Sequence, residues 1–580
     1  MTTDPTEPTE QTEQTDQAEQ TGAMDPIRLE IWWSRLAAIA DEAATTLLRT
    51  AFSTIIRESN DYTVVVMNAS GETIAECRAG IPAFAALMGT LTRRLLERFP
   101  ADTWREGDRV ITNDPWLATG HLPDVAMVSP VFHRNRLVGF TGTAAHLPDI
   151  GGSHTMGATD LMAEGLLIPP LHLFRAGVRN EEVVRLLLGN VRLAGQVWGD
   201  LEAQIAANEV CRRRTVEFLR DTGQDDLSAL SRAVHRRAEV AMRRAVAAVP
   251  DGVYRSRVEA DGVPGRPTRI ECAVTVRGEE ITVDYGGSSP QVRHAVNSTL
   301  NYTTAYTVHP LKIVLDPFTR SNSGSYRCVR VTAPEGSILN PVFPAPVLAR
   351  HLTGHLLCCA VYQALAGVLP ERVIADSGGA PALRVQLSGR DERGEEFGLV
   401  LFASAGMGAS AHADGLSATA FPTNSGGGGI EALEAGSPLL FTRKEYRPDS
   451  GGAGTMRGGL GQVIEVHNPT SWPVRAVLLG DREEHPAQGM RGGRPGLPAA
   501  VEIRPGAGGE GSAAVPLKSA TVLPPGGTMV IRFAGGGGYG PPAGREPAAI
   551  AADLRAGLVS RSAAVEDYGA ETVTRVRAGA

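Results

Sequence analysis

The chain has 580 residues and a formal net charge of −8 at neutral pH. Because a chain of this length exceeds what a single hydrophobic core usually supports, we expect several domains. Hydrophobic residues make up 42% and charged residues 21%, with no basic excess of the kind that marks a nucleic-acid-binding protein. No apolar run approaches the roughly 20 residues that a membrane-spanning helix needs, so no membrane contact is expected.

The first helix is predicted directly after an acidic tail. Residues 1–23 carry six acidic and no basic side chains, and this low-complexity tail is expected to be disordered. Residues 25–52 have apolar side chains at helical spacing, with Asp25 as the N-cap before a proline. Two strands joined by a turn are predicted at 61–77, and a second helix at 84–100.

A repeated motif flanks the next predicted element, a β-hairpin. Its strands are expected at 125–132 and 137–145. The letters HLPD stand directly before the first strand, at 121–124, and again directly after the second, at 146–149. Because the two strands pair, both His-x-x-Asp units should lie side by side at the open end of the hairpin.

The two HLPD units together predict a metal site. With the turn centred near 134–135, Asp124 is expected to face Ala145. Each leucine precedes a proline and is therefore extended, while a cis Leu-Pro bond, which the sequence leaves open, would bring histidine and aspartate closer. Two imidazoles with one carboxylate are a recurring ligand set for Mn, Zn or Fe. A single such unit would more often cap a loop.

The remaining elements predict a multi-domain α+β fold. Residues 180–248 are mainly helical, strands and turns dominate after 251, a helical stretch lies near 351–369, and glycine is dense after 406. We therefore predict a mixed fold with the following division: a helix-rich N-terminal domain with the hairpin metal site (24–250), a middle α+β domain (251–400), and a β-rich, glycine-dense domain with a C-terminal helix (401–580).

Cysteine and lysine usage narrows the function. Six cysteines without a C-x-x-C spacing, behind an N-terminus that lacks the layout of a signal peptide, predict reduced thiols and a cytoplasmic location. The chain has three lysines, and none stands in a Walker A loop or a protein-kinase pattern. ATP chemistry by either route would therefore need another chain.

Segments spread along the chain resemble the hydantoinase B family. They include "SNDYT" (59–63), "GDRVITNDPWLATGHLPD" (107–124), "AHLPDIGG" (145–152), "GNVRLAGQVWGDLEAQIAAN" (189–208), "RPDSGGAGTMRGGLG" (447–461) and "GGGGYGPPAGREP" (535–547). The resemblance runs in order from about residue 25 to residue 580. The family includes B subunits of ATP-dependent N-methylhydantoinases, the matching half of 5-oxoprolinases, caprolactamase, and acetone and acetophenone carboxylases.

The resemblance implies a set of metal ligands. His121, Asp124 and His146 match the family's metal site by position, Asp61 resembles a further ligand, and His485 in "DREEHPAQG" is a candidate late ligand. The aspartate left over from the second unit, Asp149, is the predicted general base. The chain departs from the family where many members have His-Ile-Pro-x-His and it has "GIPAF", and where they have His-His and it has His-Leu, so the substrate is not carried over.

The resemblance also implies a partner and a reaction. In this family an actin-like A subunit binds ATP and phosphorylates an amide or ketone oxygen of the substrate. The B subunit carries the metal and completes the hydrolysis or carboxylation. The leading prediction is therefore the B subunit of an ATP-dependent cyclic-amide hydrolase, in a hetero-oligomer with an A-like subunit. Three alternatives remain: the B-type subunit of a ketone carboxylase, a non-haem iron oxygenase with the same ligand types, and a scaffold without catalysis.

Overall fold

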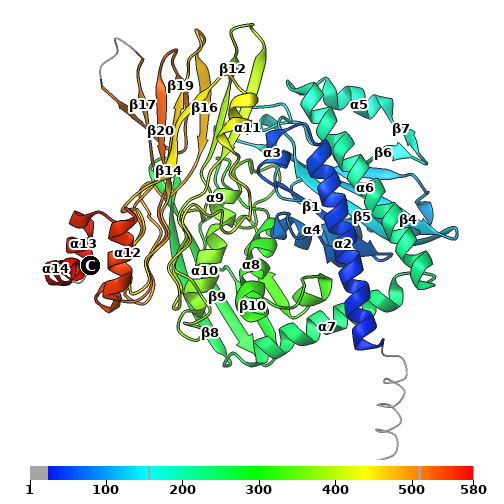
Figure 1. Cartoon of the computed structure of the whole chain (residues 1–580). Helices are drawn as coiled ribbons and strands as arrows, with labels where there is room; N and C mark the ends of the chain where they lie inside the picture. The colour runs from blue at the N-terminus through cyan, green and yellow to red at the C-terminus, as the bar shows by residue number, and fades with distance from the viewer. Residues whose placement is uncertain (1–23, 154–156, 507–510, 579–580) are drawn as a thin grey trace, which may run out of the picture.

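The computed structural model describes residues 24–153, 157–506 and 511–578. Within these ranges, helices pack on four β-sheets in a mixed α+β arrangement (Figure 1), which confirms the predicted fold class. None of the helices described is both long and apolar enough to cross a membrane. The predicted acidic tail at 1–23 lies outside the described residues.

A seven-stranded sheet, ordered β2-β1-β5-β4-β3-β6-β7, carries the HLPD hairpin. Every residue of β1 is buried because its alternate side chains face two layers of helices. Val64 and Val66 pack in the core formed with α2 and α6, whereas Val65 and Met67 pack with α4 on the opposite face. The strands are β1 Tyr62–Asn68, β2 Thr73–Glu76, β3 Arg109–Thr112, β4 Asp124–His133, β5 Arg136–His146, β6 Leu171–Arg175 and β7 Val178–Arg179. The helices of this part are α2 Pro26–Thr50, α3 Thr54–Arg57, α4 Pro82–Arg98, α5 Glu181–Leu188, α6 Ala194–Thr222 and α7 Ser228–Ala247.

The middle of the chain forms a four-stranded sheet, ordered β11-β10-β9-β8, on which α10 packs. One helix here, α8, was not predicted, because Pro310 lies inside it and proline removes a helical hydrogen bond. This part contains β8 Gly252–Val263, β9 Arg266–Arg277, β10 Glu280–Asp284, α8 Leu300–Leu315, the 3-10 turn η3 Ser323–Tyr326, β11 Val329–Thr332, α9 His351–Gly354 and α10 Leu356–Leu365.

Two sheets share one apolar core in the C-terminal part. Their orders are β13-β12-β16-β19 and β14-β15-β20-β17-β18. The first of them spans the boundary that the sequence predicted near residue 400, since β12 pairs with both β13 and β16. The elements are β12 Arg384–Arg390, β13 Glu396–Phe402, α11 Ile430–Ala435, β14 Leu440–Tyr446, β15 Gln462–His467, β16 Val474–Leu479, β17 Ala500–Arg504, β18 Ala513–Val515, β19 Ala520–Leu523, β20 Thr528–Arg532, α12 Pro547–Arg555, α13 Arg561–Tyr568 and α14 Ala570–Ala578.

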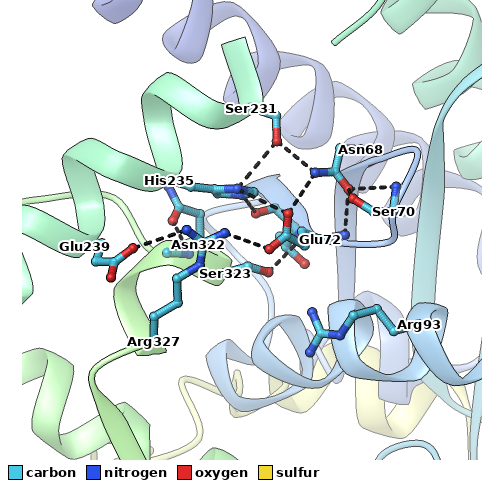
Figure 2. A network of polar contacts seen from close by, with 12 residues as sticks. Asn68, Ser70, Glu72, Arg93, Ser231, His235, Glu239, Asn322, Ser323 and Arg327 are labelled. Atoms are coloured by element: carbon cyan, nitrogen blue, oxygen red, sulfur yellow. Dashed lines mark hydrogen bonds and ion pairs between the residues drawn. The ribbon is translucent and has the colours of Figure 1, made fainter. Parts of the chain in front are cut away.

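A polar network fastens the turn between β1 and β2 to α7 and η3 (Figure 2). The Asn68 amide donates to Glu72 Oε2 at 3.0 Å and to Ser231 Oγ on α7 at 2.9 Å. Arg327, which follows η3, bridges Glu72 at 2.7 Å and Glu239 at 3.1 Å. The middle of the chain is thereby tied to the sheet that carries the hairpin.

Candidate metal centre

The β4–β5 hairpin places Asp124 directly opposite His146. The predicted partner, Ala145, was wrong by one residue, because a β-bulge between Val131 and Phe132 shifts the register. Directly opposite residues project from the same face of a sheet, with Cβ atoms about 5 Å apart. The bulge therefore brings a carboxylate and an imidazole of the two HLPD units together.

His121, Asp124 and His146 form a compact buried cluster, in which one ligand atom of each residue lies within 4.8 Å of the other two. Asp124 Oδ1 is 2.9 Å from His121 Nε2 and 2.8 Å from His146 Nδ1. The three side chains are between 0% and 5% exposed. Both Leu-Pro bonds of the HLPD units are trans, so the cluster forms without a cis bond there.

The hydrogen bond on the far side of the His121 ring favours a cation inside this cluster. His121 Nδ1 lies 2.8 Å from the carbonyl oxygen of Leu348, and since a carbonyl only accepts, Nδ1 carries the hydrogen. Nε2 of the neutral ring then points its lone pair at the Asp124 carboxylate, which also only accepts. His121 Nε2 is accordingly buried without a hydrogen-bond partner. A divalent metal between the facing acceptors would satisfy both, so these residues fit a metal ion.

The electrostatics keep two of these groups in the form that binds metal. Burial, reinforced by Arg350, lowers the pKa of His121 to about 3, so its ring is neutral near pH 7. Burial alone would raise the pKa of Asp124, but the neighbouring His121 and Arg350 and the hydrogen bond from His146 hold that pKa well below its usual value. Metal ligands must be deprotonated, and both residues meet this requirement.

Arg350, which the sequence analysis did not single out, holds the second oxygen of Asp124. Its Nη2 donates to Asp124 Oδ2 at 2.7 Å and its Nε to the Thr119 carbonyl at 2.5 Å, while its guanidinium lies 4.1 Å from the ring centroid of Tyr302. Gly120 makes room for this side chain: it has a φ of +93°, and a Cβ there would lie 2.7 Å from Arg350 Cδ. The glycine before the first HLPD is thus a part of the site.

Asp61 adjoins the cluster without belonging to its compact core. Its Oδ2 is 3.8 Å from His146 Nδ1 and 3.5 Å from Arg384 Nη2. Its backbone carbonyl accepts the His146 N–H at 3.0 Å, which fixes the start of β1 beside the hairpin. Burial raises the pKa of Asp61. The structure therefore brings Asp61 to the site, and its role as a further ligand remains a prediction.

Asp149 lies beside His146 on a cavity wall, but both of its oxygens are engaged. Oδ1 accepts from Gly151 N at 3.0 Å and Arg192 Nη1 at 2.7 Å, and Oδ2 accepts from the backbone N–H of Arg192 and of Leu193. Through these contacts Asp149 anchors the start of α6. The role of Asp149 as general base remains a prediction, and these contacts argue against it.

His485 is not part of the compact cluster, and its role as a late ligand remains a prediction that its contacts oppose. Its Nδ1 is 2.9 Å from Asp261 Oδ1 and its Nε2 is 3.8 Å from Glu259, and both carboxylates belong to β8. It lines a different cavity, together with Arg482 and Gln488. Both ring nitrogens of His485 therefore lie next to carboxylates of β8.

Two further histidines, His351 and His355, lie close to the cluster on and just after α9. His351 is fully buried, and neither of its ring nitrogens has a hydrogen-bond partner within the described part of the chain. His355 Nε2 is 3.2 Å from the Tyr302 hydroxyl. Burial, followed by the charge of Arg384, keeps the pKa of both rings well below its usual value. The run "RHLTGH", polar within a buried helical stretch, is the sequence signal that could have found them.

A cavity of about 310 Å³ opens beside His146. One wall comes from the second HLPD unit, the N-terminal end of α3 and the first turn of α6. The facing wall is the sheet of β13, β12 and β16. A small molecule in this cavity would contact the cluster from the His146 side.

These features define a mixed α+β protein with a buried candidate metal centre beside a cavity. Residues 25–542 match the Hydantoinase B/oxoprolinase family, and the chain belongs to that family. The putative D-/L-hydantoinase B subunit of Pseudomonas sp. (strain NS671) is 31% identical, over 94% of this chain and 95% of that protein. The acetophenone carboxylase delta subunit of Aromatoleum aromaticum is 25% identical, over 94% of this chain and 86% of that protein.

A solved structure supports the same assignment. The crystal structure of ATP-dependent caprolactamase from Pseudomonas jessenii has a TM-score of 0.88 and 30% sequence identity, covering 96% of this chain and 100% of that one. The predicted family and fold class are therefore confirmed. The relatives are named as subunits, which implies that members of this family work with partner subunits.

Proposed function

We propose that this protein is the metal-bearing B subunit of an ATP-dependent enzyme that hydrolyses a cyclic amide. The observation that carries the proposal is the buried cluster of His121, Asp124 and His146, with an unpartnered imidazole nitrogen, at the side of a cavity. Hydantoins and caprolactam, after which two of the similar proteins are named, are cyclic amides. The three lysines of the chain stand in neither of the two ATP-binding patterns considered, which supports ATP binding on a partner A-like subunit.

The residues of the cluster would hold Mn, Zn or Fe, with Asp61 as the candidate further ligand. When bound, a divalent cation supplies Lewis acidity and lowers the pKa of water, which suits attack on an amide that phosphorylation has activated. The Leu348 carbonyl sets the tautomer of His121, and Arg350 orients Asp124. The cavity beside His146 would then position the activated ring against the cluster.

Metal content and partner-dependent turnover test this proposal. The chain is purified natively with its A-like partner, and its metal is measured by plasma mass spectrometry. ATP consumption is then screened with hydantoins, 5-oxoproline, lactams and ketones. We expect bound metal and ATP-dependent ring opening of a cyclic amide. Native protein without metal would contradict the proposal and favour a scaffold.

Ketone carboxylation is the second candidate, because the acetophenone carboxylase delta subunit matches this chain along 94% of its length. The same screen separates the two reactions. ATP turnover with a ketone that requires bicarbonate would favour carboxylation, whereas turnover with a cyclic amide in the absence of bicarbonate would favour hydrolysis.

A further inference from the structure

A groove of about 1490 Å³ lies where α7 passes the N-terminal end of α2 (Figure 1). One side of the groove is the start of α2, and the other is the exposed face of α7. Apolar side chains are exposed on both sides, namely Ile27 and Ile31 of α2 and Val240 of α7. Exposed apolar residues that gather in a groove with a polar rim are typical of a binding surface.

The groove is strongly basic. Of the six charged residues that line it in the described part of the chain, five are arginines and one is Glu30. Glu30 is already engaged, by Arg237 at 2.9 Å and by Arg320 at 2.7 Å. Arg232 and Arg244 form no ion pair with any residue that the structure describes. Exposed arginines without a partner are common, so this charge identifies no ligand unless an acidic segment matches it.

The acidic tail has such a matching pattern in its sequence. Residues 3–20 consist of six triplets, each with Thr or Ala first, Asp or Glu second, and Pro or Gln third. A polyproline-II chain completes a turn in about three residues and rises about 3.1 Å per residue, so every third side chain faces the same side. In that conformation the carboxylates of the tail would form one row with a spacing of about 9 Å. These acidic residues are Asp4, Glu7, Glu10, Glu13, Asp16 and Glu19.

The arginines of α7 have a compatible spacing. Arg232 and Arg244 are 12 residues apart, which is about 18 Å along a helix that rises about 1.5 Å per residue. Two triplets of the tail cover about 19 Å in polyproline II, so two carboxylates six residues apart can reach both arginines. The chain also enters the groove directly, because Met24 and Pro26 line it. Glu19 is five residues before Met24 and hence within about 18 Å of it.

We propose that residues 3–20 dock along this groove, with carboxylates of the tail paired to Arg232 and Arg244. Exposed ion pairs are individually weak and are screened by salt. Because the tail is tethered at the end of the groove, its effective concentration is on the order of millimolar, and several weak pairs then suffice to hold it. The docked tail covers Ile27 and Ile31 and keeps this surface from acidic segments of other proteins. Neither the candidate metal centre nor the proposed function is needed for this docking.

A fluorophore on the tail tests the docking in the full-length chain. The six cysteines of the sequence are buried, so Thr12→Cys provides one reactive thiol. We expect the fluorescence anisotropy of this label to be high in about 0.01 M salt and to fall in about 1 M salt, because the screening length drops from about 30 Å to about 3 Å. The value in high salt should equal that of a variant in which amides replace the six acidic residues of the tail.

Two charge-reversed pairs of arginines test whether the tail binds in this groove. Arg232→Glu combined with Arg244→Glu should release the tail in low salt. Arg185→Glu combined with Arg255→Glu changes the net charge equally, at two exposed arginines that do not line the groove, and should leave the tail docked. Circular dichroism verifies the fold of all these variants.

Arginine modification provides a readout from the groove itself. Phenylglyoxal should modify Arg232 and Arg244 about twofold or more faster in the amide variant of the tail than in the wild type, since a tail docked for half of the time shields them by that factor. Arg185 should react at the same rate in both proteins, and mass spectrometry of peptides measures the rates.

Several results would overturn the proposal. They are an anisotropy that does not change with salt, equal release by the two pairs of substitutions, and equal modification rates at Arg232 and Arg244. A dimer of the wild-type chain, or its binding to phosphatidylserine vesicles, would also overturn it if either depends on these two arginines, because the groove would then have another occupant.

Discussion

Asp124 Oδ1 lies 2.8 Å from His146 Nδ1 because a bulge in the β4–β5 hairpin brings the two residues into direct register. Without the bulge, Asp124 would face Ala145, and His146 would project from the other face, since strand side chains alternate. The cluster of His121, Asp124 and His146 therefore depends on one extra residue in a strand.

His121→Ala should remove most of the bound metal. The change deletes one of the three proposed ligands and leaves the Leu348 carbonyl without its imidazole donor. Plasma mass spectrometry of the purified protein measures the loss, and circular dichroism verifies the fold. His412→Ala, at an exposed histidine of the C-terminal part, is the control and should keep its metal. Full metal occupancy in His121→Ala would refute the ligand assignment.

Arg350→Lys should weaken metal binding by about 10- to 100-fold, the usual effect of losing a partner that orients a ligand. Lysine keeps the charge but lacks the planar fork that holds Asp124 Oδ2 and the Thr119 carbonyl and stacks on Tyr302. Competition with a chelator measures the dissociation constant. Arg390→Lys at the cavity rim serves as the control, and equal affinities of the two variants would contradict the orienting role.

Gly120→Ala should destabilise the protein more than Gly177→Ala. Both glycines have positive φ, so alanine costs roughly 1–2 kcal/mol at either site. Only at Gly120 does the new Cβ meet a neighbour, Arg350 Cδ at 2.7 Å, whereas nothing lies within 4 Å at Gly177. We expect about 1–3 kcal/mol of further destabilisation from this overlap, together with weaker metal binding. Thermal unfolding measures the loss of stability, and chelator competition measures metal affinity. If Gly120→Ala and Gly177→Ala lost the same stability, the positive φ alone would account for the effect.

Glu164→Gln should become more stable relative to the wild type as the pH rises. Burial raises the pKa of Glu164 from 4.5 to about 8, while its Oε1 accepts the Leu348 N–H at 2.8 Å. Between these pKa values the folded state binds a proton that the unfolded state has released, so wild-type stability falls with increasing pH. Glutamine keeps an acceptor and does not titrate.

Unfolding midpoints at pH 5, 6, 7 and 8 check this sign, with Glu484→Gln at an exposed glutamate as the control. The gap between Glu164→Gln and the wild type should widen steadily toward pH 8. A gap that is constant or shrinks would mean that Glu164 is ionised in the folded protein throughout this range.

Asp149→Asn distinguishes an anchor from a base. As an anchor, Asp149 holds Arg192 and the start of α6, so the variant should lose about 1–3 kcal/mol of stability and retain metal and most ATP-driven turnover. Arg192→Gln should then reproduce the loss of stability. A drop in turnover of about 100-fold or more at unchanged stability would instead identify Asp149 as the base.

Sequence patterns predicted the parts of the site that are close together along the chain. The HLPD spacing around a hairpin brought together His121, Asp124 and His146, although the bulge at Val131 has no signature strong enough to correct the register. Arg350 and Leu348 could not be placed, because they reach the cluster from more than 200 residues away and no local pattern encodes that approach. Arg384 was missed for the same reason, since β12 meets Asp61 only in the folded chain.

The hydrogen bond from His121 to Leu348 also has a consequence for biosynthesis. Both HLPD units emerge from the ribosome long before residue 348, and at that stage nothing fixes the tautomer of His121 or neutralises the second oxygen of Asp124. A nascent hairpin would hold a metal ion loosely and exchange it freely. Tight loading, and with it discrimination between the metals of the cell, would begin only when the segment around 348–350 has been synthesised and has docked.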